Sequence, residues 1–175
     1  MLCQLGARRT HQPLRRFSRH LLRRHRPRPL AGLPLDDNRR ATVVVDTAAL
    51  SPALKDTDAF YPVLGAWLGT EVGNAVAVID GLPGNLGEDR LKGLGAAAAS
   101  SGAVALFHVA GVTPEAPTVE AALGGRAPEM TLYPTAVELS AVRDRLSTAV
   151  EPSGRIDAVA VGSPHFSLDE FAALE

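Results

Sequence analysis

Several short stretches of this chain are apolar at nearly every position, and this feature most limits the folds open to it. Residues 75–79 and 103–109 are the clearest examples, and residues 42–45 and 156–161 have the same character. A strand is apolar along its whole length when both of its faces are buried, as in a parallel sheet covered by helices. The sequence therefore predicts an α/β fold with a parallel sheet of about four strands and helices on both faces.

The segments between these strands carry helical signals. Apolar residues recur at helical spacing in residues 56–68, and residues 88–100 include a run of four alanines, the residue with the highest helix propensity. Residues 118–123 are expected to form a short helix. Capping boxes at residues 135–138 and 167–170 predict helices from 135 to about 149 and from 167 onward. The last helix has only begun its apolar period at residue 175, which is typical of a fragment.

The basic residues are concentrated near the N-terminus. Eleven of the 18 lysines and arginines lie within residues 1–40, together with only two of the 19 acidic residues. The remainder is acidic, so we expect it to bind no nucleic acid. We interpret residues 1–40 as a disordered Arg-rich leader and residues 41–175 as the folded domain. A transit peptide and a phosphate-binding arm are the alternatives for the leader.

Cysteine content and hydropathy limit the setting in which the chain works. Cys3 is the single cysteine, so no intramolecular disulfide can form, and the sequence fits a reducing, cytoplasmic location. No apolar run approaches the roughly 18 residues that a membrane helix needs, so no membrane partner is expected. Neither a G-x-G-x-x-G loop after the first strand nor a G-x-x-x-x-G-K-[ST] loop is present, so these nucleotide-binding loops are not predicted.

Polar side chains stand at the carboxyl ends of the predicted strands. Asp80 follows residues 75–79, His108 lies near the end of residues 103–109, and Ser163 and His165 follow residues 156–161. Open parallel sheets bind ligands outside this edge, so these residues are candidates for a site. A turn at Asp80 and a hydrogen-bonded core histidine at His108 are the structural alternatives.

Residues 162–167, Gly-Ser-Pro-His-Phe-Ser, form the most specific candidate. Glycine and proline favour a sharp turn, and a helix that begins at Ser167 would direct free N–H groups toward an anion. His165 could act as a general acid or base, and Ser163 could donate to a substrate oxygen. A plain helix cap and a loop histidine are the alternatives. The predicted catalytic residues are His165, Ser163 and His108, the predicted substrate-binding residues are Asp80 and Ser167, and no metal ligand is predicted.

Three segments carry a family likeness: residues 56–65 (DTDAFYPVLG), 94–116 (LGAAAASSGAVALFHVAGVTPEA) and 162–168 (GSPHFSL). They resemble the large subunit of the aconitase X family, and the likeness covers almost all of residues 42–175. The resemblance implies an aconitase-like domain, an iron or iron–sulfur centre, and a small swivelling domain or subunit as partner. Members include cis-3-hydroxy-L-proline dehydratases and a mevalonate 5-phosphate dehydratase. Ser163, where other members have cysteine, resembles the hydroxyproline branch.

The chain departs from this family in its cysteines. Members use cysteine ligands for the cluster, whereas residues 42–175 contain none and Cys3 lies in the leader. One thiolate cannot hold a cluster that needs several. The sequence therefore predicts a fragment of a hydro-lyase that dehydrates a small hydroxy acid such as cis-3-hydroxy-L-proline, inactive on its own. The alternative is a non-catalytic α/β module that binds a small carboxylate at residues 162–167.

Overall fold

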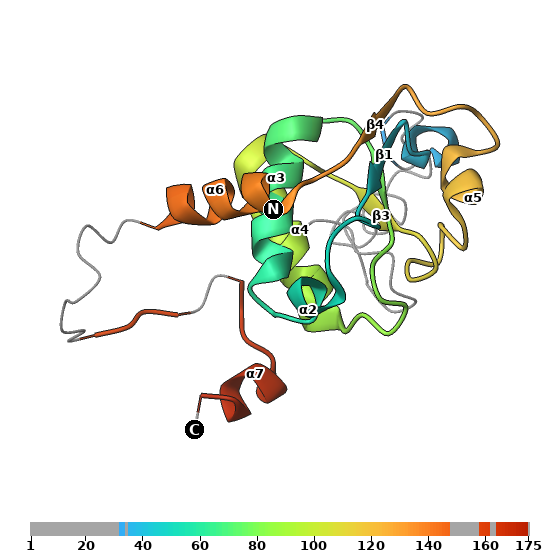
Figure 1. Ribbon diagram of the computed structural model, residues 1–175. Coiled ribbons are helices and arrows are strands. Elements are labelled where there is room, and N and C mark those ends of the chain that lie inside the picture. The colour runs from blue at the N-terminus through green and yellow to red at the C-terminus, as the bar shows by residue number, and fades with distance from the viewer. Residues whose placement is uncertain (1–31, 34, 148–157, 162–163, 175) are drawn as a thin grey trace, which may run out of the picture.

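The computed structural model describes residues 32–33, 35–147, 158–161 and 164–174 (Figure 1). In chain order the elements of this part are the 3-10 helix η1 (Asp36–Arg39), β1 (Val43–Asp46), α2 (Pro52–Lys55), α3 (Phe60–Val72), β2 (Ala77–Asp80), α4 (Glu88–Gly102), β3 (Phe107–Val109), α5 (Val119–Leu123), β4 (Met130–Leu132), α6 (Ala136–Leu146) and α7 (Leu168–Ala172).

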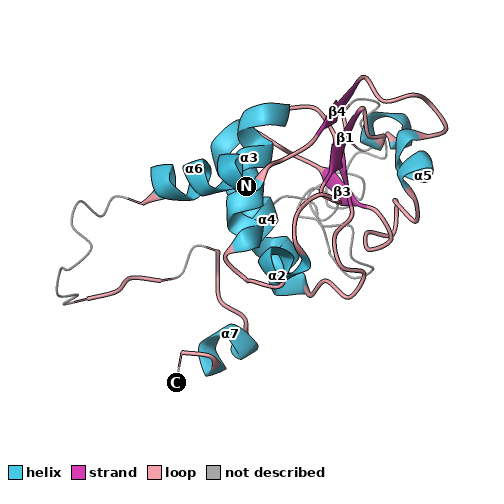
Figure 2. Cartoon of the chain, viewed as in Figure 1, coloured by secondary structure: helices cyan, strands magenta, loops and turns pink. Residues whose placement is uncertain are grey.

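The strands form a four-stranded parallel sheet in the order β3-β2-β1-β4 (Figure 2). Val45 of β1 lies opposite Ile79 on one side and Leu132 on the other. The predicted α/β class and the parallel sheet are thus confirmed. The strand order reverses beside β1, because β2 and β3 extend to one side of it and β4 lies on the other.

One predicted strand is wrong and one was missed. Residues 158–161, the described part of the predicted strand 156–161, form no strand, and Val159 and Val161 are 74% and 55% exposed. The fourth strand is β4, at residues 130–132. It has only three residues, lies at the edge of the sheet and exposes Met130, so it lacks the long apolar run of a strand buried on both faces.

Helices cover both faces of the sheet, as predicted. α3, α4 and α6 lie on one side and α5 on the other (Figure 1). Val45, Ile79 and Val109 belong to the larger core, with α3 and α4, whereas Val44 and Val78 pack with α5. This alternation follows from the strand geometry, in which successive side chains point to opposite faces.

The predicted helices occur with shifted bounds. Residues 88–100 and 118–123 correspond to α4 and α5, and the capping boxes at residues 135–138 and 167–170 are both formed. The segment predicted as one helix over residues 56–68 differs, because α2 ends at residue 55 and α3 begins at residue 60. No helix of the described residues is both long enough and apolar enough to cross a membrane.

α3 and α4 pack with their backbones unusually close. A Cβ atom built on Gly65 would lie 2.2 Å from the main-chain oxygen of Leu94, and one built on Gly102 would lie 1.6 Å from that of Gly69. Neither distance leaves room for a methyl group. Glycine therefore permits the contact between these two helices, which together supply ten of the 21 buried residues of the larger core.

The last residues of the predicted leader pack on the domain. Arg39, at the end of η1, is buried, and its Nε and Nη2 donate to the two carboxylate oxygens of Glu115 at 2.7 and 2.6 Å. Its main-chain oxygen lies 2.7 Å from Nε2 of His108. The predicted disorder of residues 1–31 falls outside the described residues, and the division of the chain at residue 40 stays a prediction.

Candidate functional site

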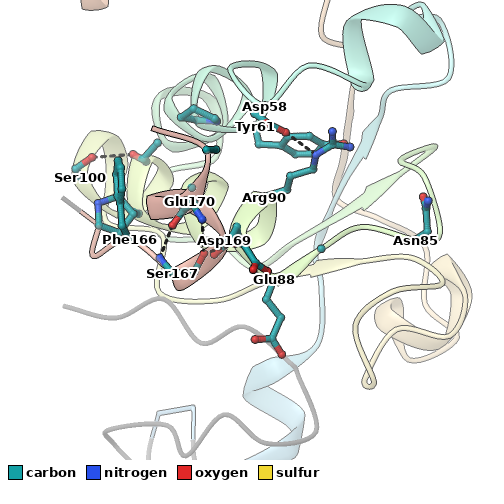
Figure 3. Close-up of a pocket in the computed structure, with 18 residues that line it drawn as sticks. Asp58, Tyr61, Asn85, Glu88, Arg90, Ser100, Phe166, Ser167, Asp169 and Glu170 are labelled. Atoms are coloured by element: carbon teal, nitrogen blue, oxygen red, sulfur yellow. Dashed lines mark hydrogen bonds and ion pairs between the residues drawn. The ribbon is translucent and has the colours of Figure 1, made fainter. Parts of the chain in front are cut away.

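A cleft of about 1040 Å³ lies between α4 and the C-terminal segment that carries α7 (Figure 3). Lys92 of α4 joins the two sides, because its Nζ donates to Oδ1 of Asp89 at 2.7 Å and to Oε2 of Glu170. Ser167 adds a second link, since its hydroxyl donates to Oδ2 of Asp89 at 2.7 Å. The segment is thus held on α4 by polar contacts.

The polar groups at the start of α7 already have partners. The N–H of Ser167 donates to Oε2 of Glu170 at 2.7 Å, and the N–H of Glu170 donates to the Ser167 hydroxyl at 3.1 Å. The Lys92 hydrogen bond, followed by that of Ser167, holds the pKa of Asp89 and of Glu170 below the usual range. Both carboxylates are therefore charged at neutral pH, and an anion placed here would face them.

A different set of polar groups lies at the carboxyl edge of the sheet. Asp46 and Asp80 end β1 and β2 and lie side by side in the register. Oδ1 of Asp46 accepts from the N–H of Ala48 at 2.8 Å, and Oδ1 of Asp80 accepts from the N–H of Gly81 at 2.9 Å. In each carboxylate the second oxygen has no hydrogen-bond donor within the described chain. Asp80 is exposed and can reach a ligand at this edge.

Lys55 and Tyr61 complete this edge. Tyr61 donates through its hydroxyl to the main-chain oxygen of Lys55 at 2.7 Å, and Lys55 donates through Nζ to the main-chain oxygen of Gly81 at 2.9 Å. Burial raises the pKa of Tyr61, although Arg90, which lies over its ring, opposes that shift. A cleft of about 530 Å³ opens here, lined by Lys55, Gly81 and Leu82 among others.

Lys55 was not among the predicted site residues. Lysine is mostly exposed in proteins, and nothing around this position in the sequence indicates burial. Its exposed fraction is only 7%. The burial results from packing between α2 and the turn after β2, two segments that are 26 residues apart at the Lys55–Gly81 contact.

The structure distributes the predicted site residues rather than gathering them. Asp80 lies at the sheet edge, whereas Ser167 lies in the α4–α7 cleft. His108 is buried within β3 at 2% exposure, and its Nε2 is bonded to the main chain of Arg39, which fits the alternative of a core histidine. His165 is exposed. Ser163 lies outside the described residues, and the roles of all five stay predictions.

The side chains of the described part do not fit an iron–sulfur cluster. No group of three or more histidine, cysteine, aspartate or glutamate side chains among them could hold a metal ion. Such clusters are bound by several thiolates, and the one cysteine of the chain, Cys3, lies outside the described residues. The donors that the family likeness implies are therefore not found in this part of the chain.

Comparisons with known proteins agree with the family likeness. Residues 41–144 match the sequence model described as the aconitase X second domain. A cis-3-hydroxy-L-proline dehydratase from Pseudomonas aeruginosa is 45% identical over 147 residues, which cover 83% of this chain and 24% of the relative. The phosphomevalonate dehydratase large subunit of Thermococcus kodakarensis is 37% identical over 142 residues, with 81% of this chain and 33% of the relative covered.

A solved structure resembles the fold as well. The crystal structure of Thermococcus kodakaraensis aconitase X in its holo-form aligns with a TM-score of 0.54 and 37% sequence identity, covering 66% of this chain and 27% of the other. The chain thus spans between a quarter and a third of the length of these proteins.

Proposed function

Since the chain belongs to the aconitase X family, we propose that it supplies the second domain of a hydro-lyase that dehydrates a small hydroxy acid. The observation that carries this proposal is the 45% identity to a cis-3-hydroxy-L-proline dehydratase. Ser163 in the Gly-Ser-Pro-His segment, the pattern of the hydroxyproline branch, supports the same substrate. We therefore propose cis-3-hydroxy-L-proline, or a close analogue, as the hydroxy acid.

The 175 residues are proposed to be inactive by themselves. They span 24% of the Pseudomonas aeruginosa relative, and their one cysteine cannot hold an iron–sulfur cluster. The family implies such a centre, and its ligands would have to come from outside the described residues. The Thermococcus kodakarensis relative is a large subunit, which supports a second, smaller subunit or domain as partner.

Within such an enzyme, this domain would face the substrate with the carboxyl edge of its sheet. Loss of water from a hydroxy acid requires removal of a proton beside the carboxylate and departure of the hydroxyl group with a proton. The unbonded oxygen of Asp80 can accept a hydrogen bond from a substrate hydroxyl or ammonium group. His165 is exposed and remains our candidate for proton transfer, with Ser163 and Ser167 as candidates for substrate contacts.

A domain exchange tests the proposal. Residues 41–144 replace the matching segment of the Pseudomonas aeruginosa dehydratase, and consumption of cis-3-hydroxy-L-proline is followed by proton NMR after anaerobic reconstitution with iron and sulfide. We expect the hybrid to turn over the substrate. The control hybrid carries the matching segment of the Thermococcus kodakarensis large subunit and is expected to be slower. A folded but inactive first hybrid would contradict the domain role.

The isolated chain is assayed in parallel under the same conditions. We expect no turnover, and measurable dehydration by the 175 residues alone would refute the proposed inactivity. The alternative of a stand-alone carboxylate-binding loop at residues 162–167 gains no support from the contacts of Ser167, since its hydroxyl and N–H groups are both bonded and two carboxylates lie beside them.

A further inference from the structure

Lys55 is a buried positive charge without a negative partner. Two side chains that carry a full charge are buried among the described residues, Arg39 and Lys55, each with 7% of its surface exposed. Arg39 forms a two-pronged ion pair with Glu115. Lys55 forms a single hydrogen bond, to the main-chain oxygen of Gly81 at 2.9 Å, and has no carboxylate partner in the described part of the chain.

A buried ammonium group with one hydrogen bond and no carboxylate partner is unfavourable for the domain without ligand. An ammonium group carries three donors, and removing it from water costs free energy unless an opposite charge or several acceptors replace the water. One carbonyl oxygen satisfies one of the three donors. The main chain of Lys55 is nevertheless held in place, because Tyr61 donates to its carbonyl oxygen from a fully buried position. The fold thus positions a charge that it leaves largely uncompensated.

The location of Lys55 indicates what could compensate it. Its Nζ lies beside Gly81, directly after the last residue of β2, so it stands at the carboxyl edge of the sheet. Open parallel sheets bind their ligands at this edge. Lys55 also lines the cleft of about 530 Å³ at that edge, which is open to a small molecule.

We propose that Lys55 binds the carboxylate of a small hydroxy acid in the cleft between α2 and the turn after β2. This proposal rests on the proposed function for the identity of the acid, and it assigns a binding residue to it. A charge-assisted hydrogen bond from a buried ammonium is stronger than one between neutral groups. Asp80, which precedes Gly81, is exposed and has an unbonded oxygen at the same edge of the sheet, although it does not line the cleft itself. Asp56 also lines the cleft, but its side chain is 86% exposed and pairs with Arg90.

A binding experiment on the full chain tests the proposal directly. The probe is cis-3-hydroxy-L-proline, and the matched control ligand is its carboxamide, which keeps the ammonium and hydroxyl groups but lacks the carboxylate. We expect the acid, and not the amide, to raise the melting temperature and to shift the side-chain NMR signal of Lys55. Lys55→Met and Lys55→Gln should both lose the response, and glutamine retains a donor for Gly81. Arg143→Met, which removes the same charge from an exposed position on α6, should keep it.

The stability of the free variants separates a binding role from a structural one. Replacing an uncompensated buried charge by methionine should leave the melting temperature unchanged or raise it. If Lys55 had only a structural role, its replacement by methionine would lower the melting temperature. A marked fall in melting temperature for both Lys55 variants, or an equal response of Lys55→Met and the unchanged chain to the acid, would overturn the proposal, as would a chain that does not respond to the acid.

The hybrid dehydratase distinguishes failure of this proposal from failure of the proposed function. Lys55→Met in the active hybrid should raise KM by about 10- to 100-fold, as expected for the loss of a hydrogen bond between charged groups, with a smaller change in kcat. An active hybrid with unchanged KM would refute the role of Lys55 and leave the function intact. An inactive hybrid, combined with a Lys55-dependent response of the chain, would refute the function and retain a carboxylate site.

Discussion

Lys55 and Lys92 lie in two regions of the domain and differ in their partners, since Lys92 pairs with carboxylates and Lys55 does not. At the α4–α7 contact Lys92 meets two carboxylates, Asp89 and Glu170. At the carboxyl edge of the sheet the more deeply buried Lys55 meets one carbonyl oxygen. A buried charge that only stabilises the fold is usually paired with an opposite charge. A buried charge that lacks such a partner is a candidate for binding a ligand. The comparison therefore marks the sheet edge as the better candidate for a ligand site.

The two regions also differ in how firmly they are held. The sheet edge is backed by the larger core, in which Tyr61, Leu64 and Ile79 are fully buried. No residue of α7 is buried, and its apolar side chains Leu168 and Phe171 are 87% and 55% exposed. Partly exposed ion pairs contribute little to stability, so the α4–α7 contact should open without unfolding the domain.

The largest effect is expected where both regions depend on the same support, the contact between α3 and α4. Gly65→Ala would place a methyl group 2.2 Å from the Leu94 main-chain oxygen, so one helix must move. We expect a loss of about 1 to 3 kcal/mol in the free energy of unfolding, as for other overpacked cores. Chemical denaturation measures it, and both the Lys55 response and the α7 contact should weaken together.

The control for this substitution lies one helix away. A Cβ on Gly93 of α4 would lie 3.7 Å from Cδ of Pro62, an ordinary contact. Gly93→Ala should therefore stabilise the domain by about 0.5 to 1 kcal/mol through helix propensity. If Gly65→Ala were as well tolerated as Gly93→Ala, the close approach of the two helices would be refuted.

The parts of this fold that could be predicted are those in which local sequence and burial agree. β1, β2 and β3 were predicted because their residues are apolar and buried on both faces. The apolar residues at 158–161 suggested a strand that is not there, because an apolar run is buried only if the fold provides a surface for it. β4 pairs with β1 along one side of the sheet, and it was missed because its residues are exposed or half-buried and do not belong to an apolar run such as residues 103–109, which indicated β3.

The candidate site was predictable only in part. The rule that ligands bind at the carboxyl ends of parallel strands predicts a site at the edge of the sheet where the structure places Asp80. It says nothing of Lys55, whose burial depends on a contact between segments far apart in the sequence. The same rule made His108 a site candidate, but in the structure its Nε2 is hydrogen-bonded to the main chain of η1. This bond could not be predicted, because the sequence assigns η1 to the leader.

Tyr61→Phe is the next largest test, because it loosens the sheet edge alone. The substitution keeps the ring and removes the donor to the main-chain oxygen of Lys55. We expect a loss of about 1 to 2 kcal/mol in the free energy of unfolding, since a buried acceptor remains without its partner, and a weaker response to carboxylate. Tyr133→Phe is the control, because Tyr133 is 63% exposed. Equal costs for the two substitutions would show that the Lys55 main chain is not held by this bond.

A smaller effect is expected from Lys92→Met, which acts on the α4–α7 contact. It removes both ion pairs, so the amides of α7 should lose their protection from hydrogen exchange while those of α3 and α4 keep theirs. The free energy of unfolding should change by less than about 1 kcal/mol, as is usual for partly exposed ion pairs. A loss of protection throughout the domain would mean that the C-terminal segment belongs to the cooperative core, and the contrast between the two regions would disappear.

Acidification should release α7 with the smallest effect on the rest of the molecule. The hydrogen bonds of Lys92 lower the pKa of Asp89 and Glu170, so their charged forms favour the docked state. The stabilisation of the docked state by these two charges is complete above the ordinary carboxyl pKa of about 4. It is lost as the pH falls through the lowered pKa of each carboxyl in the docked state. Carboxyl carbon NMR of Glu170 measures the titration, and the amide signal of Phe171 reports the release. Glu170→Gln should abolish the Glu170 titration and weaken docking already at neutral pH. An α7 that stays docked after both carboxyls have become neutral would mean that apolar contacts between the C-terminal segment and α4, rather than the ion pairs of Lys92, hold the segment.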